Sequence, residues 1–336
     1  MRKFPLFILV LLFGFNSIVH SQIGLTGGKG MLRVLSADPV KPADIIVQWN
    51  VSTYMKQASK ASLAKYYRSN LSATFGLAHY LETYLNWIPY QDDQEHLWGM
   101  RGNTLLGIKY LTPLRTDFFK FGLAGSFIIP TASKGNVPFE TFFTNKAAWS
   151  ARGIITLDFL KMMPRHPLKI NLNFGYMDHD VTDTYFTSEI DQLFIGAGFK
   201  FPIRSVQFYT EYSGEIFFNK KDLPFNQNSS RISQGIRFLG PWDNVIDISF
   251  DFALTQYDSL KETDIFHKEY YKWQVRAGIT HRFSVYKYFD KSAKLKRKKD
   301  EEERRKLEAI RRKREKVKQD LEKMKKSLEE NGKKKK

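Results

Sequence analysis

After residue 43 the sequence is built from segments of about ten residues in which apolar and polar side chains alternate. In residues 44–54, for example, Val47 and Trp49 share one face of an extended chain, whereas Gln48 lies on the other. A period of two is the signature of a β-strand whose faces meet different environments. Strands of this length with such a period are typical of a membrane-spanning β-barrel, which meets lipid outside and a polar lumen inside.

Twelve segments between residues 44 and 283 fit this pattern, and single-chain bacterial barrels have even strand numbers. The fold class predicted is therefore all-β, a transmembrane antiparallel up-and-down barrel of about 12 strands followed by a charged C-terminal α-helix. Outward-facing tryptophans are expected at positions 49, 149 and 273. The predicted strands are Asp44–Tyr54, Asn70–Leu77, Leu81–Pro89, Gly102–Tyr110, Phe118–Ile129, Trp149–Phe159, Leu168–Met177, Gln192–Phe201, Val206–Ile216, Arg231–Leu239, Asn244–Leu254 and Tyr271–Phe283.

The connections between these strands alternate in length, as they do in outer-membrane barrels with long outer loops and short periplasmic turns. We therefore assign the long set to the cell exterior and the short set to the periplasm. The long connections are 55–69, 90–101, 130–148, 178–191, 217–230 and 255–270. The short connections are 78–80, 111–117, 161–167, 202–205 and 240–243.

The N-terminus indicates export. Arg2 and Lys3 precede an apolar run that ends at Phe15, and Val19-His20-Ser21 offers small or tolerated residues before a cleavage position ahead of Gln22. This is the pattern of a secretory signal peptide. The predicted organisation is a signal peptide at 1–21, an irregular periplasmic lead-in at 22–43, the barrel at 44–283 and a basic helical tail at 284–336. The chain has no cysteine, so disulfides and thiolate metal sites are excluded.

The formal net charge of +18 is concentrated in the tail, where residues 291–336 carry 22 Lys and Arg against 10 Asp and Glu. A basic nucleic-acid-binding face on the barrel is therefore not expected. Apolar residues recur at three- and four-residue steps between Leu307 and Leu328, which fits a short coiled coil or a single solvated helix; a disordered tail is the third possibility. Expected partners are outer-membrane lipid and, through the tail, an anionic cell-wall polymer or an acidic or helical periplasmic protein.

Charged side chains of both signs fall on the inward-facing positions of the strands. We expect them to pair with one another and to fill most of the lumen, because buried charges are stable only when partnered. The alternative is a thin wet channel with a weak preference for anions. The predicted lumen-facing charges are Glu82, Lys109, Lys120, Arg152, Asp158, Lys169, Lys200, Glu211, Arg237, Asp247, Asp251, Lys272 and Arg276.

No motif in the sequence predicts catalysis or a bound cofactor. His96, His179 and His267 fall on predicted outer loops, but the sequence has no nucleophile elbow. The acidic run around His179 does not have the spacing of a known calcium loop. We therefore expect no enzyme activity, no cofactor and no metal, with a barrel hydrolase as a lesser alternative.

Two segments resemble known outer-membrane proteins. Arg276, Gly278, His281 and Phe283 in the last strand resemble the signal that the outer-membrane assembly machinery reads. The segment 27–37, Gly-Gly-Lys-Gly-Met-Leu-Arg-Val-Leu-Ser-Ala, followed by a barrel, resembles outer-membrane-protein-A-like barrels of Bacteroidetes-type Gram-negative bacteria. That resemblance implies a surface barrel with a periplasmic peptidoglycan-binding domain, which the charged tail replaces here.

These observations predict a protein of the Gram-negative outer membrane with its tail in the periplasm. The expected role is structural, with the basic tail tethering the barrel to the envelope. The alternatives are a passive narrow channel for small solutes and, less favoured, an outer-membrane barrel hydrolase. The sequence leaves open which solute or partner would be bound, the oligomeric state and whether the lumen is open.

Overall fold

The structure is a computed structural model of the chain, and it divides into two units, residues 1–284 and 285–336, which are considered separately. The residues described are 22–59, 62–92, 99–132, 144, 146–159, 167–203, 205–221, 223–240, 243–255, 271–285, 301–303, 308 and 315. The predicted signal peptide and most of the predicted tail lie outside these ranges.

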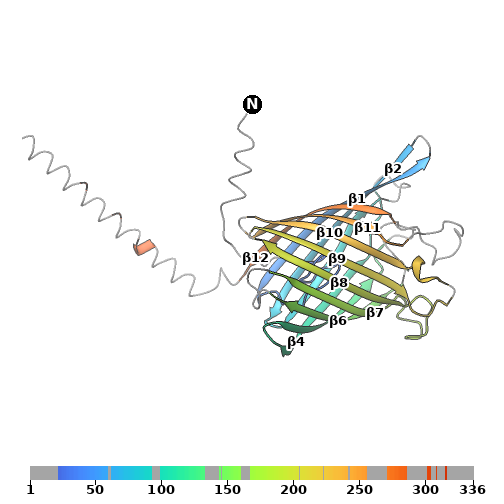
Figure 1. Cartoon of the computed structure of the whole chain (residues 1–336), viewed down its shortest axis with the longest axis horizontal. Helices are drawn as coiled ribbons and strands as arrows, with labels where there is room; N and C mark the ends of the chain where they lie inside the picture. Colours follow the sequence, from blue (N-terminus) through green and yellow to red (C-terminus); the bar gives the residue numbers. More distant parts are fainter. Residues whose placement is uncertain are drawn as a thin grey trace, which may run out of the picture. The chain divides into compact units, whose positions relative to one another are not determined.

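The described residues of the first unit form a closed barrel of twelve antiparallel strands, each hydrogen-bonded to its neighbours in the sequence (Figure 1). This confirms the predicted fold class. The strands are β1 (Asp44–Ser59), β2 (Ser62–Ala78), β3 (Leu81–Gln91), β4 (Thr104–Arg115), β5 (Phe119–Ile129), β6 (Ala148–Asp158), β7 (Lys169–Asp178), β8 (Gln192–Ile203), β9 (Val206–Phe217), β10 (Ser229–Leu239), β11 (Asn244–Ala253) and β12 (Trp273–Ser284).

The first and last strands close the barrel. They pair antiparallel along ten residues, from Asp44 opposite Ser284 to Thr53 opposite Val275. Closure leaves no unpaired strand edge, which is required of a sheet surrounded by hydrocarbon, where water cannot hydrogen-bond to the backbone. A short 3₁₀ helix, η1 (Phe225–Gln227), lies in the connection between β9 and β10.

The barrel is apolar outside and polar inside, the reverse of a water-soluble protein. In β11, Phe250 and Phe252 are 47% and 51% exposed, whereas Asp251 between them is fully buried. Trp49 and Trp273 are likewise exposed on the outer face, and Trp149 is partly covered by ring contacts with nearby tyrosines. A continuous apolar outer surface is what a lipid bilayer stabilises.

The first hairpin is longer than the sequence pattern predicts. Residues 55–69 were expected to be a loop, but most of them belong to β1 and β2, where Met55 pairs with Lys65. The two strands extend beyond their neighbours in Figure 1. Two paired strands can extend beyond the rest of the barrel because each satisfies the backbone hydrogen bonds of the other. This backbone pairing does not require apolar and polar side chains to alternate.

The described part of the second unit is small. Residues 301–303, Glu308 and Glu315 are helical, in agreement with the predicted helix at those positions. The apolar seam that could form a coiled coil lies outside the described residues. Among the described residues, no helix is long and apolar enough to cross a membrane.

Candidate functional site

Residues 22–43, which we call the plug, lie inside the barrel. The sequence predicts a periplasmic lead-in here, but in the structure Met31, Val34 and Ala37 have no solvent exposure. Leu35 and Ala37 pack with barrel residues in one apolar cluster, and Met31 and Leu32 pack in another. The segment therefore fills part of the lumen instead of leading up to it.

A tight turn shapes the first part of the plug. Gly27 and Gly28 have positive φ angles of 85° and 77°, which glycine adopts without strain. A Cβ atom on Gly27 would lie 2.9 Å from the Cβ of Tyr84 on β3. The glycines thus let the plug turn directly against the barrel wall, which gives the glycine-rich segment a structural role.

Glu211 on β9 holds the middle of the plug. Its carboxylate accepts hydrogen bonds from the backbone N–H groups of Leu32 at 2.9 Å, Arg33 at 2.8 Å and Val34 at 3.3 Å. Successive N–H groups directed at one carboxylate form an anion-binding concavity. Here the plug supplies the concavity and the barrel supplies the anion.

Glu82 on β3 and Lys109 on β4 form a second attachment point. Their side chains make a 2.8 Å ion pair, and both are almost completely buried. Glu82 also accepts hydrogen bonds from the backbone N–H groups of Lys29 and Val40, both at 2.9 Å. Lys109 donates to the carbonyl oxygen of Ser36 at 2.8 Å. Each charge therefore has its opposite partner and also satisfies the backbone of the plug.

The remaining attachments follow the same rule. Asp38 in the plug pairs with Lys120 on β5 and with Lys169 on β7. Arg237 on β10 donates to the carbonyl oxygen of Gly30 at 3.0 Å. Asn173 on β7 bonds both the N–H and the carbonyl of residue 35, at 2.7 and 2.9 Å. A backbone without regular structure can be buried in a lumen only if its polar groups are satisfied in this way.

Most of the charges predicted to face the lumen contact the plug or each other. Direct contacts with the plug come from Glu82, Lys109, Lys120, Lys169, Lys200, Glu211, Arg237 and Asp251. Asp158 pairs with Lys169, and Asp247 pairs with Arg237 at 2.6 Å. Lys272 differs, because it is exposed and precedes β12.

Sequence reasoning did not predict that three charged residues of the plug, Lys29, Arg33 and Asp38, lie among the charges of the barrel wall. The signal available was the stretch 31–35, four apolar residues interrupted by Arg33, in a segment otherwise too short and irregular to fold alone. Period-two analysis does not detect it, because the plug is not a strand of the barrel.

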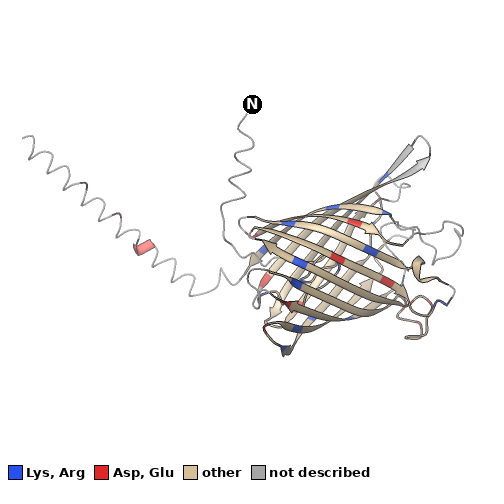
Figure 2. Cartoon of the chain, in the orientation of Figure 1, with Lys and Arg blue, Asp and Glu red and all other residues tan. Residues whose placement is uncertain are grey.

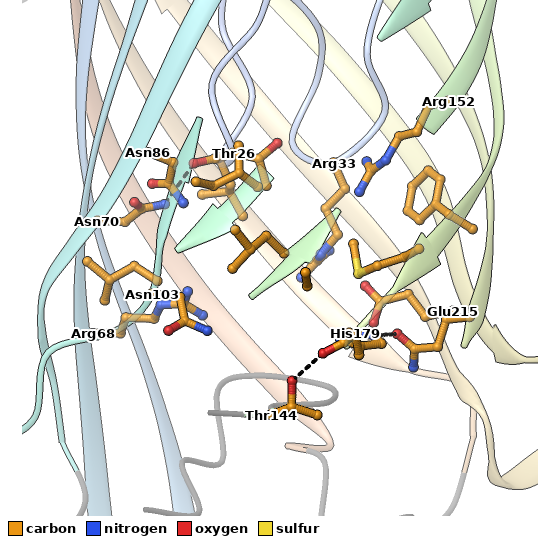
Figure 3. Close-up of a pocket in the computed structure, with 18 of the residues that line it drawn as sticks. Thr26, Arg33, Arg68, Asn70, Asn86, Asn103, Thr144, Arg152, His179 and Glu215 are labelled. Carbon is orange, nitrogen blue, oxygen red and sulfur yellow. Dashed lines mark hydrogen bonds between the residues drawn. The ribbon is translucent and has the colours of Figure 1, made fainter. Parts of the chain in front are cut away.

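Beyond the plug the lumen contains a pocket of about 210 Å³, which we call the chamber (Figure 3). Leu25, Thr26 and Arg33 of the plug form part of its lining. The other lining residues come from the barrel wall and from the long connections, including Thr144, Lys146 and His179. The chamber thus lies between the plug and the barrel end that carries these long connections.

An arginine cluster occupies one side of the chamber. Arg33 and Arg276 contact the same carboxylate oxygen of Asp251, at 2.6 and 2.7 Å. The Arg33 side chain also donates to the Tyr271 hydroxyl at 3.0 Å, and the Arg231 guanidinium lies 4.1 Å from the centroid of the Tyr271 ring. Three guanidinium groups therefore surround one tyrosine and one carboxylate.

Arg152 on β6 lines the chamber separately. Its guanidinium lies 4.1 Å from the centroid of the Phe194 ring, a favourable cation–π arrangement. In Figure 3 the side chains of Arg152 and Arg33 both extend into the chamber. Within the described part of the chain, Arg152 makes no ion pair with a carboxylate.

The loop that carries the acidic run lies at the rim of the chamber. The Nε2 atom of His179 is 2.7 Å from the side-chain oxygen of Gln192. Asp180 forms an ion pair with Lys146. The hydrogen bond that Lys146 donates in this pair holds the pKa of the Asp180 carboxyl below its usual value. Across the described residues, no three metal-binding side chains are grouped as a metal site would require. His96 and His267 lie outside the described residues.

The residues of the predicted assembly signal all belong to β12. Arg276 lines the chamber, and a Cβ on Gly278 would clash with the side-chain oxygen of Asn50 on β1. The His281 ring packs edge-on against Phe283 with ring centroids 4.3 Å apart. Recognition by the assembly machinery stays a prediction.

Comparisons with known proteins find similarity among solved structures. No protein-family model and no curated protein sequence matches the chain. Among solved structures, the NanC porin is similar at 10% identity, with 70% of this chain and 98% of that one covered and a TM-score of 0.45. The KdgM porin is similar at 6% identity over 71% and 99%, with a TM-score of 0.44. An outer membrane channel from Pseudomonas putida F1 has 8% identity over 74% and 98%, with a TM-score of 0.48.

The fold itself is established by the structure, a closed antiparallel β-barrel of twelve strands with an apolar outer face. The expected tethering role is contradicted, because the similar solved structures are described as porins and as an outer membrane channel. The structure describes only a few positions of the tail that was expected to act as the tether. The interpretation had given most weight to the tail's charge, which says nothing about the barrel.

Proposed function

We propose that this protein is a passive outer-membrane channel for small solutes and that the plug controls passage through it. The observation that carries the proposal is a solute-sized chamber inside a closed barrel, lined by polar and charged side chains. A barrel of about twelve strands encloses a lumen wide enough for such a chamber. An apolar exterior and a polar interior are the physical requirements for carrying a polar solute through lipid.

Passage requires that the plug shift, because it is attached to strands on every side of the barrel, from Glu82 on β3 to Asp251 on β11. The attachments are hydrogen bonds and ion pairs, which can exchange for water one at a time. The apolar contacts of the plug are limited to small clusters. This arrangement suits a segment that is held in place but can be displaced.

The test is conductance of the purified full chain in planar bilayers, with Glu211→Gln as the variant. The substitution keeps the shape of the side chain but removes the charge that three plug N–H groups contact. Hydrogen bonds to charged groups contribute about 1.5–3 kcal/mol each. A loss of about 3 kcal/mol shifts the balance between seated and displaced plug roughly 100-fold. We expect more frequent or larger single-channel steps.

Glu189→Gln is the matched control, because Glu189 lies on the outer connection, where its exposed carboxylate pairs with Lys220. We expect its conductance to equal that of the unmodified chain. A full chain and a Glu211→Gln variant that both give no steps under any voltage would overturn the proposal.

The finer points belong to the same proposal. The long connections face the cell exterior, the tail lies in the periplasm and the chain carries out no catalysis. We also propose that the barrel is related to outer-membrane-protein-A-like barrels of Bacteroidetes-type bacteria, which rests on the segment 27–37. The tight packing of that segment against the wall gives a physical reason for its glycine-rich sequence.

A further inference from the structure

We infer that the chamber is a binding site for a small anionic solute, one that carries a carboxylate or a phosphate on a hydroxyl-rich body. The inference rests on the proposed channel function and adds the class of solute. It assigns recognition of the anionic group to the arginines of the chamber, with Arg152 as the principal contact. The barrel wall and the plug both contribute to this site.

The charges of the chamber are the first argument. Its lining contains six cationic side chains and a single carboxylate, Glu215. Three further carboxylates do not line the chamber but pair with residues that do. Asp180 pairs with Lys146, and both Glu211 and Asp251 pair with Arg33. Among the described residues, Arg152 forms an ion pair with none of these carboxylates, so its positive charge is available to an anionic solute. Charge held inside a barrel surrounded by lipid is stabilised by an opposite charge, which an anionic solute would supply. The six cations are Arg33, Arg68, Lys146, Arg152, Arg231 and Arg276.

The partners of individual groups are the second argument. Within the described residues, Arg152 contacts an aromatic ring and forms no ion pair with a carboxylate. Arg276 is 6% exposed, and its Nη1 atom has no acceptor among those residues. A planar guanidinium with free donors matches the oxygen pair of a carboxylate or phosphate.

The neutral polar groups of the chamber are the third argument. Asn70 and Asn86 are each 6% exposed, and the side-chain oxygen of each has no donor among the described residues. The side-chain nitrogen of Gln192 likewise has no acceptor there. Buried polar atoms without partners are unfavourable, and hydroxyl groups can both donate to and accept from them. This set therefore favours a solute with several hydroxyl groups.

The volume sets the size of the solute. A space of about 210 Å³ is many times the roughly 10–15 Å³ that a cavity needs to hold one water molecule. It accommodates a solute the size of a monosaccharide and excludes a folded protein. The aromatic ring of Phe194 beside Arg152 offers an apolar surface on which a sugar ring can pack.

The experiment is isothermal titration of the purified full chain in detergent with D-glucuronate and with glucose 6-phosphate; glucose is the neutral comparison. We expect at least one of the anionic sugars to bind at least about tenfold more tightly than glucose, because a charge-assisted hydrogen-bond pair is lost with the neutral sugar. Binding of glucuronate alone would assign a carboxylate as the recognised group, and binding of glucose 6-phosphate alone would assign a phosphate.

The variant Arg152→Gln should weaken binding of the anionic sugar about tenfold and leave glucose unchanged. Arg152→Lys keeps the charge but loses the planar fork, so it should restore part of the affinity. Arg115→Gln is the matched control, because Arg115 is exposed at the end of β4 and does not line the chamber. Circular dichroism checks that each variant keeps the β-barrel.

Equal affinities for glucose and for both anionic sugars would overturn the inference. Unchanged affinity in Arg152→Gln would overturn the assignment of Arg152. The two proposals can fail separately. Anion binding without conductance would reject the channel function and support the binding site. Conductance without preferential anion binding would reject the binding site and support the channel function.

Discussion

The two parts of the lumen differ in how their charges are satisfied. In the part filled by the plug, Glu82, Lys109 and Glu211 each contact an opposite charge and also bond the backbone of the plug. In the chamber, Arg152 contacts an aromatic ring, and the cationic side chains outnumber the carboxylates. Both parts belong to one barrel with one alternation of polar and apolar residues.

This difference shows that a charge facing the lumen can have either of two roles. A charge whose hydrogen bonds are all made by protein groups holds the structure together, and removing it leaves its buried partner uncompensated. A charge with donors left over can serve a solute. The pairing of a charge, more than its position on a strand, therefore separates structural from functional residues in this barrel.

The largest expected effect comes from comparing two lysine–carboxylate pairs. Lys109→Met removes the partner of fully buried Glu82, whereas Lys146→Met removes a lysine side chain that is 60% exposed. We expect Lys109→Met to lower the free energy of unfolding by about 3–5 kcal/mol and Lys146→Met to lower it by about 1 kcal/mol or less. Guanidinium unfolding in lipid vesicles, followed by tryptophan fluorescence, measures both. Equal losses would mean that the two parts of the lumen do not differ.

A smaller effect is expected from the apolar contacts of the plug. Leu35→Ala removes a buried side chain that packs against Leu111 and Ile154 of the barrel wall. Such truncations cost about 2–4 kcal/mol, so the plug should become more sensitive to protease while the barrel stays folded. Leu77→Ala is the control, because that side chain is 48% exposed on β2. Unchanged protection of the plug in Leu35→Ala would contradict the proposed seating.

The smallest expected effect is that of salt. Anion binding in the chamber should weaken several-fold when the ionic strength rises from 0.1 M to 1 M, because the screening length falls from about 10 Å to about 3 Å. The buried ion pairs of the plug are screened much less, so its protease protection should not change. Titrations and digestions at the two salt concentrations measure the difference. A plug released by salt while binding persists would reverse the comparison.

The barrel could be predicted from the sequence because its information is local. Alternation along Asn244–Ala253 indicates that Phe250 meets lipid and Asp251 the lumen, and no other segment is needed to reach that result. The length of the first hairpin was missed because hydrogen bonding between β1 and β2 continues where the alternation is no longer required.

The candidate site could be predicted only in part. Arg152 and Arg276 were expected in the lumen, but their surroundings were not. The contact of Glu211 with the backbone of Leu32 joins residues 179 positions apart, and no pattern in a single sequence indicates such a pair. The function was misjudged for a related reason, since the charge of residues 291–336 is conspicuous in the sequence and the chamber is invisible in it.

The sequence by itself determined the strands, their even number and the apolar outer face, since each of these follows from side chains two residues apart meeting different solvents. Only the tertiary structure decided that residues 22–43 fill the lumen and which charges they satisfy. The physical reason is that the inward-facing side chains have no defined interaction partners until the barrel closes. Closure then places strands that are distant in the sequence around residues 22–43. The buried N–H and C=O groups of that segment form hydrogen bonds with the charged side chains that lie close enough.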